Sequence, residues 1–122
     1  MGSDEDAVLA GPFWYGRWDE TAREHHGGHA RQLNRAARAA HYAEGAFDPD
    51  ATRAAIAGLE IPVLILVGEL DFSPSPVLAT QLGELFAPGW VRLVVQPGAG
   101  HHPWLDDAAR FGDVVTRWLA GS

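Results

Sequence analysis

The sequence contains no cysteine and no lysine, and its longest uninterrupted apolar run covers only residues 63–67. Without cysteine the chain has no disulfide, no thiolate metal site and no cysteine nucleophile. A membrane-spanning helix needs about 20 apolar residues, so this run is far too short to cross a bilayer. The acidic start of the chain, residues 1–6, is not typical of a secretory signal. We therefore expect a soluble, cytoplasmic protein.

Positive charge is also scarce. Nine arginines stand against sixteen acidic residues, so the formal net charge is 9 − 16 = −7. Binding to nucleic acid and electrostatic anchoring to a membrane both need clustered basic side chains, and we expect neither partner. The hydrophobic share of 47% excludes a disordered tail, and 122 residues are enough for a folded core.

The first part of the chain, residues 7–58, is predicted to be helical. We expect helices at 18–26 and 29–43, separated by the two glycines at 27–28, because glycine in a helix costs about 1 kcal/mol relative to alanine. A third helix is predicted over 48–58, with an N-terminal Asp-Pro pair and a final glycine. Most apolar positions here are alanines, so these helices must lie on another part of the protein.

The second part, residues 59–122, alternates strand and helix. Residues 61–67 are predicted to form a strand that is covered on both faces, as in a parallel sheet. A helix is predicted over 75–86, a second strand over 91–95, and a last helix that begins after Asp106 or Asp107. The apolar face of that last helix consists of Phe111, Val114, Val115, Trp118 and Leu119. The order predicts an α/β fold with a parallel strand-helix-strand-helix unit, preceded by helices.

One acidic and one histidine side chain follow the two predicted strands. Asp71 comes four residues after the first strand and His101 six residues after the second. Reactive groups of parallel sheets collect past the carboxyl ends of the strands. A carboxylate that faces an imidazole fixes its tautomer and prepares a general base. Separately, the aspartate could be a turn former and the histidine an ordinary surface residue; together they favour a functional pair.

At these residues the sequence resembles the C-terminal portion of the α/β-hydrolase family. Residues 61–71 are similar to that family's penultimate strand and acid loop, 96–105 to its histidine loop, and 111–119 to its closing helix. Residues 13–58 resemble its helical cap more loosely. The stretch at 11–18 is similar to caps in the branch that contains proline iminopeptidases.

The resemblance implies a cap, or lid, at 7–58 and a C-terminal hydrolase segment with an incomplete sheet at 59–122. It implies that Asp71 is the acid and His101 the base of a Ser-His-Asp triad, with His102 a neighbour without that role. The implied substrate is a small-molecule ester or an amide, including peptides. No cofactor and no metal are implied.

The nucleophile of such a triad is missing from the sequence. In the family it lies on a G-x-S-x-G turn upstream of the cap, and none of the four serines, Ser3, Ser73, Ser75 and Ser122, has that setting. Ser73 and Ser75 are explained as turn and helix-capping residues. Loss of the nucleophile costs such enzymes a factor of about 10⁶ in kcat. We therefore expect the chain to supply acid and base, to be inactive alone, and to be the C-terminal fragment of a larger hydrolase.

Aromatic residues are the candidates for a substrate pocket. The sequence places four in its first part and two beside the predicted site: Phe13, Trp14, Tyr15, Trp18, Phe72 and Trp104. Ligand pockets are mostly apolar, which favours this interpretation. It is equally possible that these rings hold the cap on the body.

Two other hypotheses remain open. The strand at 62–67 lacks a neighbour on one side, and an exposed apolar edge is a template for pairing with another chain. This predicts a homo-oligomer or strand exchange, in a non-catalytic module that binds itself, a partner or a ligand. A metal site at 24–29 would use Glu24, His25, His26 and His29, but the glycines at 27–28 weaken that helix, and a solvated helix face is the favoured interpretation.

Overall fold

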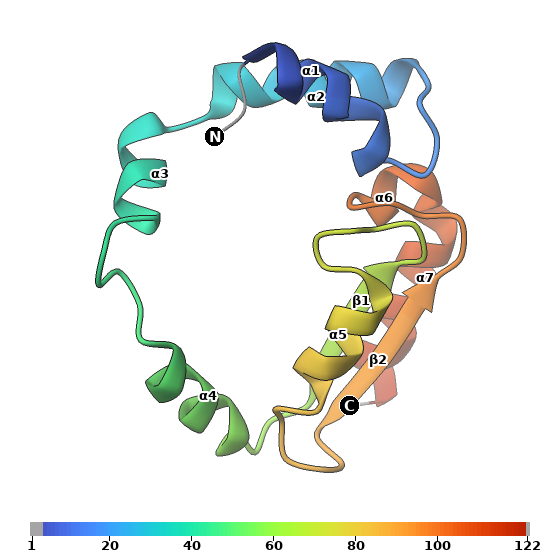
Figure 1. Cartoon of the computed structure of the whole chain (residues 1–122). Coiled ribbons are helices and arrows are strands. Elements are labelled where there is room, and N and C mark those ends of the chain that lie inside the picture. The colour runs from blue at the N-terminus through green and yellow to red at the C-terminus, as the bar shows by residue number, and fades with distance from the viewer. Residues whose placement is uncertain (1–3, 122) are drawn as a thin grey trace.

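The computed structural model describes residues 4–121 and contains a two-stranded parallel sheet, which lies on one side of the molecule (Figure 1). Strand β1 covers Val63–Gly68 and β2 covers Val91–Gln96, in a register that sets Val63 opposite Val91. The crossover between the parallel strands runs through helix α5, Pro76–Gly83. The mixed α/β class, the parallel pairing and the open sheet agree with the sequence prediction.

Helix α5 begins as predicted and ends earlier. The Ser75 hydroxyl accepts a hydrogen bond from Leu78 N–H at 3.3 Å and caps the helix. The predicted continuation to residue 86 is wrong. Beyond Gly83 the amides of Leu85 and Phe86 donate to carbonyls three residues back, a tighter turn that leads into a proline two residues later.

The last helix, α7 at Ala108–Gly121, is preceded by a short helix, α6 at Pro103–Asp106, that the sequence did not predict. Asp107 accepts a hydrogen bond from Arg110 N–H at 3.0 Å, so Asp107 is the cap of α7. The predicted apolar face of α7 is half-buried except at Leu119, which is 64% exposed. In Figure 1, α5 lies in front of the sheet and α7 behind it.

The helix boundaries in the first part differ from the prediction. Helix α2, Glu20–Gln32, continues through both glycines, and the break falls instead at Leu33, whose backbone is extended. The next helix, α3 at Arg35–His41, is capped by Asn34, which accepts a hydrogen bond from Ala37 N–H at 3.0 Å. A strong cap therefore decided where the new helix starts, and the weak helix propensity of glycine did not break α2.

Two elements precede α2, and one follows α3. Helix α1, Asp4–Ala10, and the 3₁₀ helix η1, Gly11–Trp14, were not predicted. Helix α4, Pro49–Ala57, has the predicted cap, since Asp48 accepts hydrogen bonds from two amides of its first turn.

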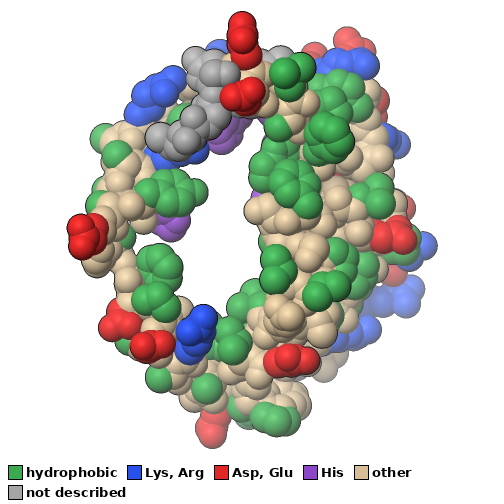
Figure 2. All heavy atoms as spheres, viewed as in Figure 1, with side chains coloured by type: hydrophobic (Ala, Val, Ile, Leu, Met, Phe, Trp, Pro, Cys, Tyr) green, Lys and Arg blue, Asp and Glu red, His purple; other side chains and the backbone are tan. Residues whose placement is uncertain are grey.

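We call residues 33–60, which include α3 and α4, the arc. Within the arc every side chain is exposed except those of Leu33 and Ile56. From α2 through α3 to α4 the chain runs away from the sheet, and it returns to the sheet at the start of β1 (Figure 1). Figure 2 shows an opening through the molecule, with hydrophobic side chains around it and charged groups mainly on the outer rim. The alanine-rich helices thus do not rest on the sheet.

Among residues 4–121, no helix combines the length and the apolar character that a bilayer crossing requires.

Candidate active site at the carboxyl ends of the strands

The loops that follow the two strands are joined to each other. Backbone hydrogen bonds continue the pairing past the sheet, from Glu69 N–H to Gln96 O at 2.9 Å and from Leu70 N–H to Ala99 O at 2.8 Å. The first loop carries Asp71. The second, residues 97–102, carries His101 and is called the histidine loop below. The sheet therefore brings both predicted residues to the same edge.

Asp71 and His101 are in direct contact. The Nδ1 atom of His101 lies 3.0 Å from Oδ2 and 3.2 Å from Oδ1 of Asp71. The Asp71 side chain is 6% exposed and that of His101 is 39% exposed. Asp71 Oδ1 also accepts a hydrogen bond from Ser73 N–H at 3.0 Å. A buried carboxylate is thus held in place and aimed at a ring that reaches solvent.

This contact determines what the imidazole can do. A carboxylate accepts only, so a neutral His101 keeps its proton on Nδ1 and leaves the Nε2 lone pair free. Within the described part of the chain, Nε2 has no hydrogen-bond partner. The arrangement can therefore take a proton from a hydroxyl or water placed at Nε2.

No serine hydroxyl of residues 4–121 bonds to that nitrogen. Ser75 caps α5, and Ser73 contributes its backbone amide to Asp71. Ser3 and Ser122 lie outside the described residues.

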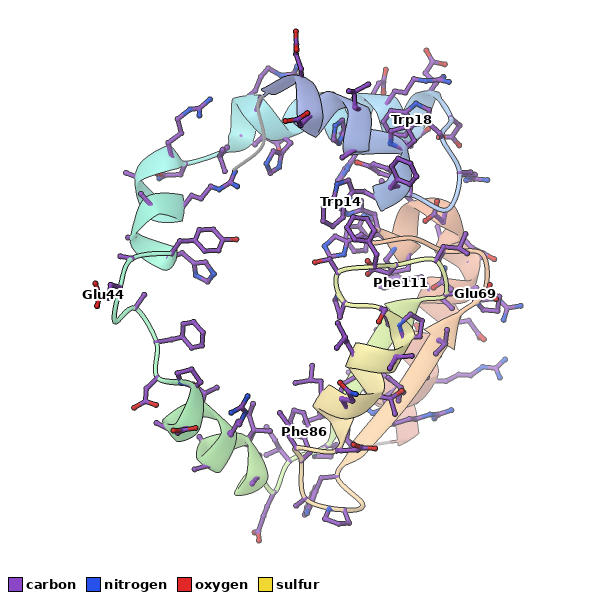
Figure 3. All side chains as sticks on the ribbon, in the orientation of Figure 1. Trp14, Trp18, Glu44, Glu69, Phe86 and Phe111 are labelled. Carbon is purple, nitrogen blue, oxygen red and sulfur yellow. The ribbon has the colours of Figure 1, made fainter. Side chains whose placement is uncertain are left out.

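Trp14 is the aromatic candidate that contacts the base. Its carbonyl oxygen accepts the backbone N–H of His101 at 2.7 Å. Its ring lies edge-on to the imidazole, with centroids 5.0 Å apart, and 4.5 Å from the ring of Phe72. Figure 3 shows Trp14 beside the loops that follow the strands. Trp14 and Phe72 therefore form an apolar wall next to His101.

Trp104 lines a cavity that also borders the pair. This cavity has a volume of about 210 Å³ and is lined by Asp71, His101, the unpaired side of β1, and residues of α5 and α7 that include Leu82 and Phe111. Most of its walls are apolar, which suits an apolar substituent of a ligand.

Among the described residues, the remaining aromatic candidates make no ring contact with His101. Tyr15 is buried and its hydroxyl lies 2.8 Å from His25 Nδ1. Trp18 lies at a tilt to the ring of Tyr15 and edge-on to that of His26, with centroids 5.3 and 5.7 Å away. Phe13 is 70% exposed. Tyr15 and Trp18 therefore hold α2 in place, and neither they nor Phe13 line the cavity.

His102 lies between these two groups of rings. It is 4.8 Å from Tyr15 and 5.2 Å from His101, centroid to centroid. Burial, with the charges of His25 and His101, lowers the pKa of His102 to about 4. Burial and the negative charge of Asp106 raise the pKa of Tyr15. His102 is thus a neutral packing residue at physiological pH.

The metal hypothesis finds no support in the contacts of His25. Its Nδ1 faces the Tyr15 hydroxyl. In the part of the chain that the structure describes, no group of three or more His, Cys, Asp or Glu side chains is arranged to hold a metal ion.

One residue of the site was missed by the sequence prediction. Asp106 was treated as a possible helix cap, but its carboxylate accepts backbone hydrogen bonds from Gly16, Arg17 and Gly100. Its partners are up to 90 residues away in sequence, so no local pattern could have indicated this role.

The chain was compared with protein-family models, curated proteins and solved structures, and none of them matches it.

Proposed function

We propose that the chain provides the acid, Asp71, and the base, His101, of a Ser-His-Asp triad that hydrolyses esters or amides. The nucleophilic serine comes from sequence outside these 122 residues. In this proposal the chain is the C-terminal portion of an α/β-hydrolase, with residues 7–58 as its cap, and it is inactive alone.

The observation that carries the proposal is the contact between Asp71 and His101. The carboxylate is buried, it receives a backbone hydrogen bond from Ser73, and it lies 3.0 Å from Nδ1 of the ring. A base prepared in this way takes the proton of an attacking hydroxyl through Nε2 and returns it to the leaving group.

The site has an apolar wall beside the base. The ring of Trp14 lies 5.0 Å from that of His101 and 4.5 Å from that of Phe72, centroid to centroid. These features support a substrate with an apolar acyl or leaving group.

The test uses a fluorophosphonate probe, which reacts with an activated serine. We expect labelling of the complete gene product that contains this chain, and no labelling of residues 1–122 alone. His101→Ala removes the base and is expected to reduce the labelling rate by a factor of about 10⁴ or more.

His41→Ala is the matched control, because His41 is an exposed histidine on α3 in the arc. This variant is expected to label at the wild-type rate. Labelling that survives His101→Ala, or a complete gene product without a reactive serine, contradicts the proposal.

A second candidate function is self-association through β1, and the unpaired edge of that strand favours it. Val63 N–H donates to the Trp90 carbonyl on the β2 side, so the peptide groups of Leu64 and Leu66 point to the side without a strand. In this alternative two copies pair their edges and bury them.

Light scattering after gel filtration tests this alternative. Two copies joined along β1 elute at twice the 13.1 kDa of one chain, and Leu66→Pro, which removes an outward amide, is expected to shift the equilibrium to monomer. A homogeneous monomer at micromolar concentration overturns the alternative and leaves the hydrolase proposal untouched.

A further inference from the structure

The carboxylate of Asp106, at the end of α6, joins two segments that are far apart in the sequence. Its Oδ2 atom accepts hydrogen bonds from Gly16 N–H at 2.9 Å and Gly100 N–H at 2.8 Å. Its Oδ1 atom accepts one from Arg17 N–H at 3.2 Å. We call this arrangement the Asp106 clamp. Hydrogen bonds to an ionised acceptor are about twice as strong as neutral ones.

The clamp fixes the backbone on both sides of the base. Gly100, which precedes His101, is bound by Asp106 itself. The amide of His101 donates to the Trp14 carbonyl at 2.7 Å, and the segment that contains Trp14 is held by Asp106 two residues further on, at Gly16. The two peptide groups that orient His101 therefore both depend on one carboxylate.

The segments can approach this closely because neither has a side chain at the contact. A Cβ atom on Gly100 would lie 2.6 Å from the Trp14 carbonyl oxygen and 2.7 Å from Tyr15 backbone atoms. A Cβ atom on Gly16 would overlap the Gly98 carbonyl. Backbone therefore lies directly on backbone, and a shift of either segment moves the other.

We infer that Asp106 is a positioning residue for His101: it binds Trp14–Arg17 to the histidine loop and so holds the imidazole against Asp71. This inference rests on the proposed function, because it explains how the base of that site is oriented. It does not depend on where the serine lies. The position of a general base affects the reaction rate strongly, since a displacement of about 1 Å in an active site can cost a factor of about 10² in rate.

The experiment compares Asp106→Asn with Asp107→Asn in the 122-residue chain. Both variants replace a carboxylate by an amide, one residue apart, but among the described residues the Asp107 carboxylate contacts Arg110, as the cap of α7 and as an ion pair, and not the histidine loop. The readout is a long-range ¹H–¹⁵N NMR spectrum of the His101 imidazole above neutral pH, which distinguishes the Nδ1–H from the Nε2–H tautomer.

We expect wild type and Asp107→Asn to show the Nδ1–H tautomer alone. Asp106→Asn keeps one acceptor oxygen but sets an NH₂ group against a backbone N–H donor at the other position, and it removes the charge that strengthens the remaining bonds. We expect it to loosen the loop and to give a mixture of tautomers. A His101 spectrum in Asp106→Asn that equals that of the wild type overturns the inference.

Amide hydrogen exchange keeps the inference testable if Asp106→Asn does not fold. In the wild-type chain the amides of Gly16, Arg17, Gly100 and His101 should exchange at one common rate, about tenfold or more slower than the solvated amides of the arc. If the backbone amide of His101 exchanges at a different rate from that of Gly16, the inference is overturned. Neither readout involves hydrolysis, so failure of the clamp and failure of the proposed function are distinguishable.

Discussion

The loops that follow β1 and β2 pack backbone against backbone, whereas the arc at 33–60 is exposed along almost its whole length. Both regions are rich in small residues, but with opposite results. In the loops glycine allows three segments to meet, and carboxylates accept hydrogen bonds from their backbone amides. In the arc alanine gives helices with good propensity and little apolar surface to bury. In this protein, therefore, segments with small side chains pack closely where carboxylates of other segments also accept hydrogen bonds from their backbone, and not where such bonds are absent.

The largest expected effect of a single substitution lies in the loops. Gly100→Ala sets a Cβ atom 2.6 Å from the Trp14 carbonyl oxygen, and backbone on both sides prevents a simple shift. We expect a loss of about 3 kcal/mol in the free energy of unfolding, measured by urea denaturation.

Gly112→Ala is the control for that prediction. Gly112 lies in α7 with no atom within 4 Å of an added Cβ. A gain of up to about 1 kcal/mol is expected there. Equal changes in the free energy of unfolding for the two substitutions would show that Gly100 does not lie against the Trp14 backbone in solution.

The core of the sheet should be the next most sensitive region. Val67 is 4% exposed at the end of β1, and Val67→Ala is expected to cost about 2 kcal/mol in thermal or urea unfolding. Phe47→Ala, in the arc, removes a larger ring that is 71% exposed and should change stability by less than about 0.5 kcal/mol. A reversed order would mean that the arc is packed in solution.

Acid should weaken the loop region through His102. The pKa of this histidine is lowered from 6.5 to about 4 in the fold, by burial and by His25 and His101, with Asp106 and Asp71 opposing. The unfolded chain therefore binds the proton first, and stability falls as the pH drops from 6.5 towards 4. Denaturation midpoints across this window measure the effect, and His102→Gln should flatten the profile. A His102→Gln profile with the wild-type slope contradicts this assignment.

Among the substitutions that are not controls, the smallest expected effect concerns a helix in the first part. An added Cβ at Gly27 in α2 has nothing within 4 Å, so Gly27→Ala should raise helix content and stabilise the chain by about 0.5–1 kcal/mol. Circular dichroism and urea unfolding test it. A loss of stability would show that α2 is broken at these glycines, as the sequence alone predicted.

The sequence predicted the features that depend on neighbouring residues or on strand order. The caps at Asp48 and Ser75 and the two strands were found from local patterns. The meeting of Asp71 and His101 followed from the rule that parallel strands end at one edge.

The features that depend on distant contacts were missed. Asp106 has the local pattern of a cap, and only the folded chain brings Gly16 to it. The continuation of α2 through its glycines was also missed, because a cost of about 1 kcal/mol per glycine is small and Asn34 provides a better start for the next helix. The exposure of the arc could not be predicted either, since alanine-rich helices are compatible with packing or with solvent.

The most direct test of the central claim, that Asp71 prepares His101 as a base, is the tautomer of His101 in Asp71→Asn. Ser73 N–H binds Oδ1 of residue 71, so the asparagine should keep its oxygen there and direct its NH₂ group at His101 Nδ1. The account predicts Nδ1–H in the wild type and Nε2–H in the variant, in long-range ¹H–¹⁵N spectra. The same tautomer in both proteins would contradict it.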